Sequence, residues 1–145
     1  MTLAEALSDN ERRERIIDDC CVLVDDEVAK KSGLGGAVIK TAYKAVKGIK
    51  PGFIRKVVNA LFDDWVQQLE PFWKDATDQG RRPDEHLERE TPQVAEALLS
   101  VTDGRIETAK TALVRTTYKK LRPSAKKHVE AAVPGLAAVL RKHVS

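Results

Sequence analysis

Apolar residues recur at steps of three and four along most of this chain, which is the spacing that places them on one face of an α-helix. The segments 9–30, 34–48, 92–103 and 105–121 show this period. The clearest stripe lies within 52–70 and comprises Val57, Val58, Leu61, Phe62, Trp65 and Leu69. No segment alternates apolar and polar residues over the length of a strand. The sequence therefore predicts an all-α protein, a compact bundle of five to seven helices.

Proline residues predict where these helices end. Proline lacks an amide donor, and its ring clashes with the carbonyl four residues earlier. We therefore expect a turn at Pro51, a break or kink at Pro71, and a helix end at Pro123. The segment 79–83, which joins glycine, two arginines and proline, is the best internal linker. Pro134 is expected to interrupt the last apolar stretch, giving one kinked helix or two short ones.

Length and composition indicate one domain, 1–145. The chain has 145 residues, of which 42% are hydrophobic and 32% charged, a composition too apolar for a disordered chain. No run approaches the roughly 18 apolar residues of a membrane span, and no secretory signal begins the chain. The only cysteines, Cys20 and Cys21, are adjacent and frame no disulfide scaffold. We expect a cytoplasmic protein without a transmembrane segment.

Two octets indicate an internal repeat. Ala37–Lys44 resembles Ala112–Lys119 position by position, and each octet is followed by a basic residue and a proline. These features predict two similar three-helix halves, about 9–78 and 84–145, that share one core. The alternative is chance, because periodic helical sequences imitate repeats easily.

The charge along the chain follows the same division. Net charge is −6 over 1–27, +8 over 28–56, −7 over 57–103 and +8 over 104–145. An acidic-basic-acidic-basic order is what two related units would produce. Any helical bundle with charged outer faces also shows uneven charge, so this alternative stays open.

Two basic helix faces are the main candidate site. The candidate contact residues are Lys40, Lys44, Lys47, Lys50, Arg115, Lys119 and Arg122. The first three and the last three are spaced i, i+4, i+7, so each set follows one side of a helix. Such faces attract a phosphate-rich partner. Lysine dominates the first face, and lysine reads bases poorly, so we predict a non-enzymatic protein that binds nucleic acid without sequence specificity.

Other readings of these charges remain open. The lysines can pair with acidic helices of the same protein, which would then be a structural helical protein or a homo-oligomer. They can also bind an anionic membrane surface, but this needs large apolar neighbours, and 34–48 offers mostly alanine. An enzyme with a dispersed site would require a deep pocket with a carboxylate or histidine of shifted pKa.

A second candidate is an anion site at the start of the segment 34–48. Backbone amides at Lys31, Ser32, Gly33 and Gly35 could hold a phosphate. The Gly-Lys-Ser/Thr ending of a P-loop is missing. The alternative is that Ser32 caps the helix and the glycines allow two helices to approach closely.

Phe72 and Trp73 form a third candidate, an interface. They follow the expected break at Pro71, and both residue types are enriched in interface cores. They are candidates for contact with a protein partner or with a second copy in a homodimer. They can equally cover the end of the bundle.

Metal and cofactor chemistry is not predicted. Acidic pairs such as Asp63–Asp64 diverge around a helix, and the Glu-x-x-His pairs of bundle metal sites are missing. His86 and Glu90 offer only a weak two-ligand geometry. We therefore predict no catalytic residue, metal or cofactor.

One stretch resembles a known family. It contains Lys31-Ser32-Gly33, Ile39-Lys40, Tyr43-Lys44-Ala45-Val46-Lys47 and Lys50-Pro51-Gly52-Phe53. Over about the first half of the chain, this pattern is similar to a family of small helical bacterial proteins of unknown function. The resemblance implies a bacterial cytoplasmic protein and transfers no site.

Overall fold

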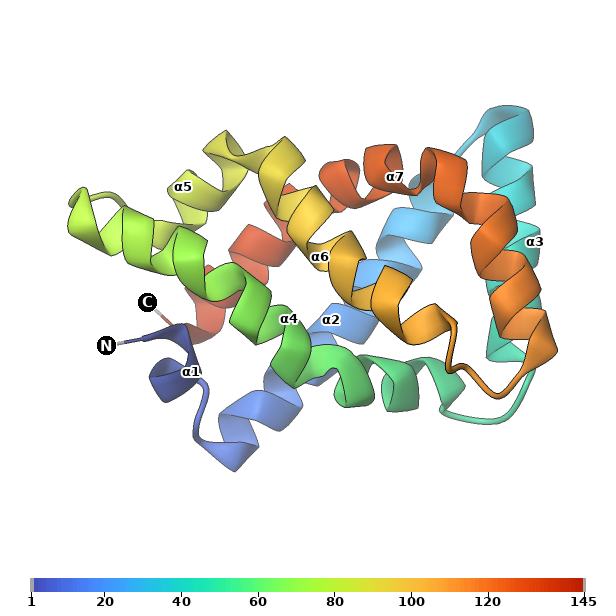
Figure 1. The fold of residues 1–145 in the computed structure, drawn as a ribbon, viewed down its shortest axis with the longest axis horizontal. Coiled ribbons are helices and arrows are strands. Elements are labelled where there is room, and N and C mark those ends of the chain that lie inside the picture. Colours follow the sequence, from blue (N-terminus) through green and yellow to red (C-terminus); the bar gives the residue numbers. More distant parts are fainter. Residues whose placement is uncertain (1, 145) are drawn as a thin grey trace.

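The computed structural model describes residues 2–144, which form helices and no strand (Figure 1). The seven helices in this range are α1 (Leu3–Ala6), α2 (Asn10–Lys30), α3 (Gly33–Lys47), α4 (Phe53–Asp78), α5 (Pro83–Arg89), α6 (Thr91–Ile106) and α7 (Ala112–Val144). The prediction of an all-α bundle is confirmed. Helices α2 and α3 begin and end within about one residue of the predicted bounds, because their apolar stripes are long enough to show the period.

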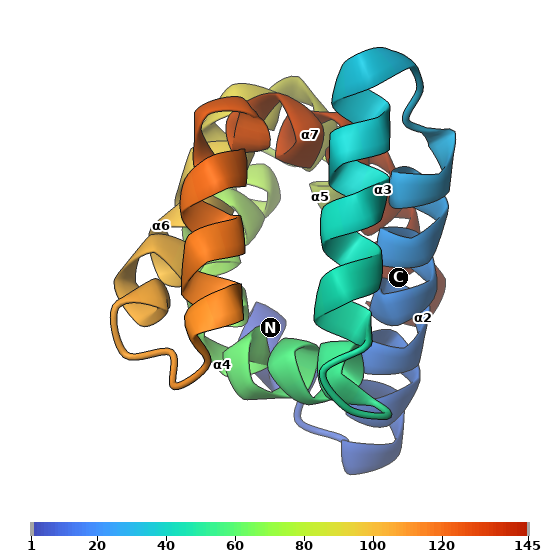
Figure 2. The ribbon, with the colours of Figure 1, turned by 90° about the vertical axis from the view of Figure 1, so that its right-hand side faces the viewer.

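The helix end expected at Pro123 is wrong, and the helix does not break at Pro71. Helix α4 continues through Pro71, and α7 continues through both Pro123 and Pro134. A proline removes one helical hydrogen bond, but on α4 the apolar face resumes beyond it, and Leu69 and Ala76 are both buried. Burial on both sides of the proline outweighs its cost of about 3 kcal/mol. Helix α7 instead bends strongly along its course (Figures 1 and 2), as helices that contain proline commonly do.

Two short helices were not predicted from the sequence. Helix α1 is fixed by a capping box between Thr2 and Glu5, and the amides of Leu3 and Ala4 donate to the Glu70 carboxylate of α4. Helix α5 starts at a proline, which suits the first turn of a helix. Neither helix is long enough to show a period of its own.

The bounds around α6 also differ from prediction. Gly104 lies inside α6, which continues to Ile106, and α7 starts only at Ala112. Thr91, one residue before the predicted segment 92–103, is the first helical residue, and its hydroxyl donates to the Glu88 carbonyl at 2.6 Å.

One contiguous core lies between α1, α2, α4, α5, α6 and α7. Its most deeply buried large side chains are Leu3, Ile16, Ile17, Leu87, Val94 and Val133. Helix α3 is the exception, because Gly36 is its only buried residue. Figure 2 looks onto α3 and the first half of α7, which run in opposite directions on this side of the molecule. The basic helices therefore lie at one end, outside the main core.

Candidate functional site

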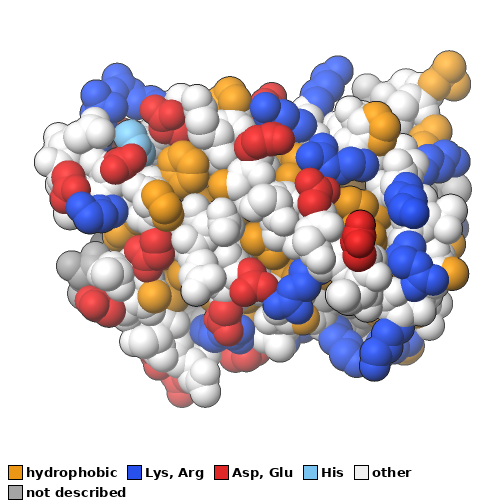
Figure 3. All heavy atoms as spheres, in the orientation of Figure 1, with side chains coloured by type: hydrophobic (Ala, Val, Ile, Leu, Met, Phe, Trp, Pro, Cys, Tyr) orange, Lys and Arg blue, Asp and Glu red, His pale blue; other side chains and the backbone are white. Residues whose placement is uncertain are grey.

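Eight exposed lysines lie on α3, the α3–α4 turn, the start of α4, the α6–α7 connection and the first half of α7. We call this surface the lysine end and define it by Lys40, Lys44, Lys50, Lys56, Lys110, Lys119, Lys120 and Lys127. None of these eight forms an ion pair with any acidic side chain in residues 2–144. Lysines on other surfaces do form such pairs, as Lys74 does with Asp78. Figure 3 shows lysine and arginine side chains concentrated over the α3 side of the face it displays.

Four of the seven predicted contact residues belong to the lysine end. Lys40 and Lys44 are exposed on α3, and Lys119 is exposed on α7. Lys50 is exposed in the α3–α4 turn, where the neighbouring ammonium group of Lys56 lowers the pKa of Lys50. Positive charge is thus concentrated here without compensation.

The other three predicted contact residues have partners within the protein. Lys47 Nζ lies 3.3 Å from a carboxylate oxygen of Asp25, and Arg122 Nε lies 2.8 Å from one of Asp103. Arg115 donates to a backbone carbonyl. For Lys47 and Arg122 the structure shows the pairing with acidic helices that the sequence left open as an alternative.

Each internal carboxylate also accepts a tyrosine hydroxyl. Tyr43 donates to Asp25, and Tyr118 donates to Asp103. The Tyr43 hydrogen bond holds the pKa of Asp25 below its ordinary value, while hydrogen bonds from Arg122 and then Tyr118 lower the pKa of Asp103. Burial, followed by the same hydrogen bonds, raises the pKa of both tyrosines. The two basic helices are thereby fixed to α2 and α6.

A further carboxylate on each of these helices binds a basic residue. Arg55 contacts Asp18 at 2.9 Å and also contacts Glu14. Lys126 lies 3.7 Å from Glu96. Asp18 and Asp25 of α2 and Glu96 and Asp103 of α6 are thus engaged with basic residues outside the lysine end.

Large apolar side chains are exposed on the same two helices. Leu34 is 91% exposed and Val38 41% exposed on α3, and Leu113 is 44% exposed on α7. These are three of the four exposed large hydrophobic residues in residues 2–144. The sequence pattern missed them, because a periodic stripe does not reveal which apolar residues lack a helix to cover them.

A groove of about 500 Å³ crosses the lysine end between the start of α4 and the α6–α7 connection. Lys50, Lys56 and Lys110 line it beside apolar residues such as Phe53 and Val57. No carboxylate is among its lining residues. The groove is therefore electrostatically suited to an anion.

The predicted anion site at the start of α3 has a carboxylate beside it. Gly33 adopts a positive φ of 71°, and Ser32 occupies the cap position without a side-chain hydrogen bond to the helix. Lys31 lies 3.9 Å from Glu27, which reduces its attraction for an anion. The predicted close approach occurs at Gly36, where a Cβ would lie 2.7 Å from the carbonyl carbon of Lys31.

Phe72 and Trp73 are half-buried and pack against the core. Their packing is that of residues that cover the bundle, the alternative considered from the sequence.

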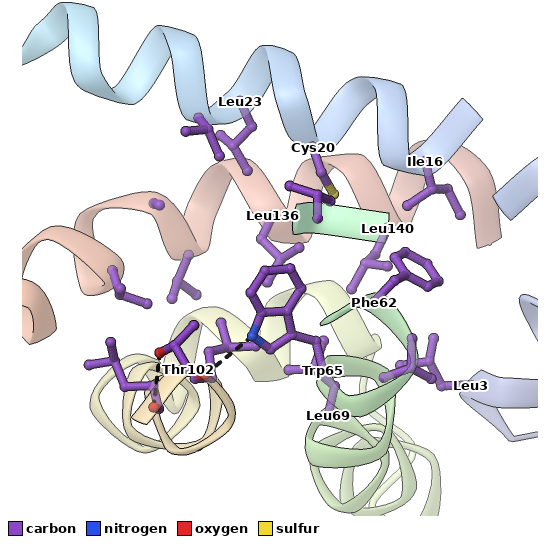
Figure 4. Close-up of a pocket in the computed structure, with 18 of the residues that line it drawn as sticks. Leu3, Ile16, Cys20, Leu23, Phe62, Trp65, Leu69, Thr102, Leu136 and Leu140 are labelled. Atoms are coloured by element: carbon purple, nitrogen blue, oxygen red, sulfur yellow. Dashed lines mark hydrogen bonds between the residues drawn. The ribbon is translucent and has the colours of Figure 1, made fainter. Parts of the chain in front are cut away.

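A second hollow of about 210 Å³ lies inside the bundle (Figure 4). Its lining is apolar and comes from α1, α2, α4, α6 and α7. The Trp65 indole donates to the Leu98 carbonyl at 3.2 Å, and the Thr102 hydroxyl lies 2.9 Å from the Tyr118 hydroxyl. The lining contains no carboxylate or histidine, so it offers no general acid or base.

The cysteines are poor nucleophiles in this setting. Cys20 lines the internal hollow, and burial raises its pKa to about 12. Burial also raises the pKa of Cys21. Thiolate chemistry is unfavourable when the thiol stays protonated.

Metal ligands do not cluster in the described part of the chain, where no three His, Cys, Asp or Glu side chains come close enough to hold an ion. His86 is buried and its Nδ1 has no hydrogen-bond partner within residues 2–144. None of the helices in this range combines the length and apolar character needed to cross a lipid bilayer.

A family model described as a family of unknown function, DUF6918, matches residues 3–144. The chain belongs to DUF6918. The match extends well beyond the first half of the chain, where the sequence resemblance was noted, and so includes every helix of this DUF6918 protein. No curated protein and no solved structure matches the chain significantly.

Proposed function

We propose that this DUF6918 protein is a non-enzymatic binding protein whose lysine end holds a polyanionic partner, with nucleic acid favoured. The observation that carries the proposal is the set of eight exposed lysines without acidic partners in residues 2–144. A polyanion releases condensed counterions when such residues neutralise its phosphates, and this release drives association. The cytoplasmic location expected from the sequence is compatible with such a partner.

Binding of this kind is expected to be independent of sequence. Lysine contacts phosphate as a flexible point charge, whereas base reading relies on the planar fork of arginine. Arg55 and Arg122, which lie near the lysine end, are already engaged with carboxylates. The lysines are therefore suited to follow a phosphate backbone.

An anionic membrane surface is a second candidate partner, favoured by one specific observation. The apolar side chains of Leu34, Val38 and Leu113 are exposed on the same helices as the lysines. Apolar insertion combined with basic residues is the usual arrangement of proteins that bind at a bilayer surface.

We also infer that the two basic helices come from one repeated unit. On α2, Asp18 and Asp25 are seven residues apart, as are Glu96 and Asp103 on α6. The first carboxylate of each pair binds a basic residue of a later helix, and the second binds a tyrosine and the basic residue four positions after it. The corresponding partners are Arg55, Tyr43 and Lys47 in one half and Lys126, Tyr118 and Arg122 in the other.

The apolar positions of α2 and α6 support the same inference. Ile16 and Ile17 are buried two and one residues before Asp18, and Val94 and Ala95 are buried at the same distances before Glu96. A duplicated unit would give the lysine end two related halves, with α3 and the first half of α7 running in opposite directions (Figure 2).

Binding assays with matched variants test the proposed function. The test variant carries Lys40→Gln, Lys44→Gln and Lys119→Gln, and the control carries Lys74→Gln, Arg81→Gln and Lys142→Gln, which remove the same charge from other surfaces. The probes are a labelled random duplex and vesicles containing phosphatidylserine. We expect the test variant to lose binding at least tenfold more than the control.

The outcomes separate the candidates. Duplex binding that depends on the three lysines supports nucleic acid, and vesicle binding alone supports the membrane candidate. Equal losses of binding in both variants would show that only the net charge of the protein matters, and would contradict a specific role of the lysine end. Binding of neither probe at low salt would overturn the proposal.

A further inference from the structure

We propose that the hollow inside the bundle is a binding site for the hydrocarbon part of a small apolar or amphipathic molecule. This inference is separate from the proposed function of the lysine end, because no lysine lines the hollow. It rests on the chemistry of the lining, on its volume and on the difference between its two ends.

The lining favours hydrocarbon over water. Side chains such as Ile16, Phe62 and Leu136 surround the volume, and the nearby indole of Trp65 already donates to a backbone carbonyl. Water needs two to four polar partners to occupy a cavity. An engineered apolar cavity of about 150 Å³ stays dry and binds benzene, and this one, at about 210 Å³, is larger.

The two ends of the hollow differ in exposure. Leu3 and Ile16 are fully buried at one end, while Leu23 and Thr102 are only half-buried at the other (Figure 4). The half-buried end comprises the later turns of α2 and α6, which lead into α3 and α7. Because α3 contributes no side chain to the core, this end is the one through which a ligand is expected to enter.

Two side chains of the lining report on occupancy. Trp65 lines the hollow, and replacing Trp73 by phenylalanine makes it the only tryptophan. Cys20 also lines the hollow, while Cys21 faces a different depression that Asp18 and Tyr43 also line. The effect of a ligand on Cys20 can thus be measured in a Cys21→Ser protein.

The first test is titration of the Trp73→Phe protein with octanol, followed by Trp65 fluorescence. Ala132→Leu fills the hollow, and Ala131→Leu makes the same change at the neighbouring exposed position. We expect saturable binding that weakens at least tenfold in Ala132→Leu and is unchanged in Ala131→Leu. Equal binding by the two variants, or no saturable change in the parent, would overturn the proposal.

The second test avoids any change in the lining. In the Cys21→Ser protein, saturating octanol should slow the reaction of Cys20 with a small thiol reagent at least fivefold. An unchanged rate would contradict the proposal even if Ala132→Leu fails to fold.

Comparing octanoate with octanol shows whether the ligand is an amphipathic anion or a neutral molecule. Octanoate that binds more tightly than octanol, and loses this advantage in the Lys40→Gln, Lys44→Gln, Lys119→Gln variant, indicates an amphipathic anion whose head reaches the lysine end. Octanol that binds more tightly than octanoate indicates a neutral ligand.

Discussion

Gly36 shows how one residue fixes the position of a basic helix. A Cβ at this position would lie 2.7 Å from the carbonyl carbon of Lys31, at the end of α2. A Cβ at the neighbouring Gly35 would meet no other part of the protein within 4 Å. The α2–α3 connection therefore requires glycine at position 36 but not at position 35.

We expect Gly36→Ala and Gly35→Ala to act in opposite directions. Gly36→Ala should destabilise the protein by about 1–3 kcal/mol, because backbone must move to relieve the overlap. Gly35→Ala should stabilise it by about 0.5–1 kcal/mol through helix propensity. Urea denaturation measures both, and a stabilising Gly36→Ala would refute the close packing of α3 on α2.

The carboxylates Asp25 and Asp103 make stability depend on acid pH. Hydrogen bonds from tyrosine and from a basic residue hold both pKa values below the ordinary 3.8 of the unfolded chain. The unfolded state therefore binds protons first as pH falls. The stabilisation from these hydrogen bonds is fully present at pH values well above 3.8. It is lost as the pH falls through 3.8 and then through the lower pKa of each carboxylate in the folded state.

Replacing both carboxylates tests this assignment. The free energy of unfolding of an Asp25→Asn, Asp103→Asn variant should vary less between pH 6 and pH 3 than that of the parent. An exposed control pair, Asp26→Asn and Asp75→Asn, should retain most of the parent's dependence. Identical pH profiles for the parent and the Asp25, Asp103 variant would show that these hydrogen bonds contribute nothing.

At the scale of elements, the sequence was sufficient where an apolar stripe is long. Helices α2 and α3 and most of α4 follow from their period. The helix end predicted at Pro123 is wrong and α4 does not break at Pro71, because local propensity does not register the apolar burial that resumes beyond a proline. The internal hollow was equally invisible, since a stripe identifies an inward face but not how closely opposing faces meet.

Pro71 is exposed on α4 and remains a local cost to the helix. Pro71→Ala restores the amide donor and should raise stability by about 1–3 kcal/mol. Pro51→Ala, in the exposed α3–α4 turn, should instead be neutral or slightly destabilising, because it frees the unfolded chain. Thermal unfolding compares the two, and a lower melting temperature for Pro71→Ala would show that α4 needs its proline.

At the scale of the whole molecule, the positions of the carboxylates decide which basic residues are ion-paired and which form the lysine end. The sequence located the two basic helices and named Lys40, Lys44 and Lys119 as contact residues. The sequence did not show that Lys47 and Arg122, in contrast, are paired with carboxylates. That pairing depends on α2 lying beside α3 and on α6 lying beside α7, which the spacing of the carboxylates along the chain does not reveal.

The most direct test of the lysine end is the salt dependence of duplex binding. Each phosphate contact contributes about 0.9 to the slope of log Kobs against log salt. We expect a steep negative slope that becomes shallower by up to about 2.7 in the Lys40→Gln, Lys44→Gln, Lys119→Gln variant, with a smaller change in the control that carries Lys74→Gln, Arg81→Gln and Lys142→Gln. Equal slopes for the parent and the test variant would show that the lysine end does not contact the duplex.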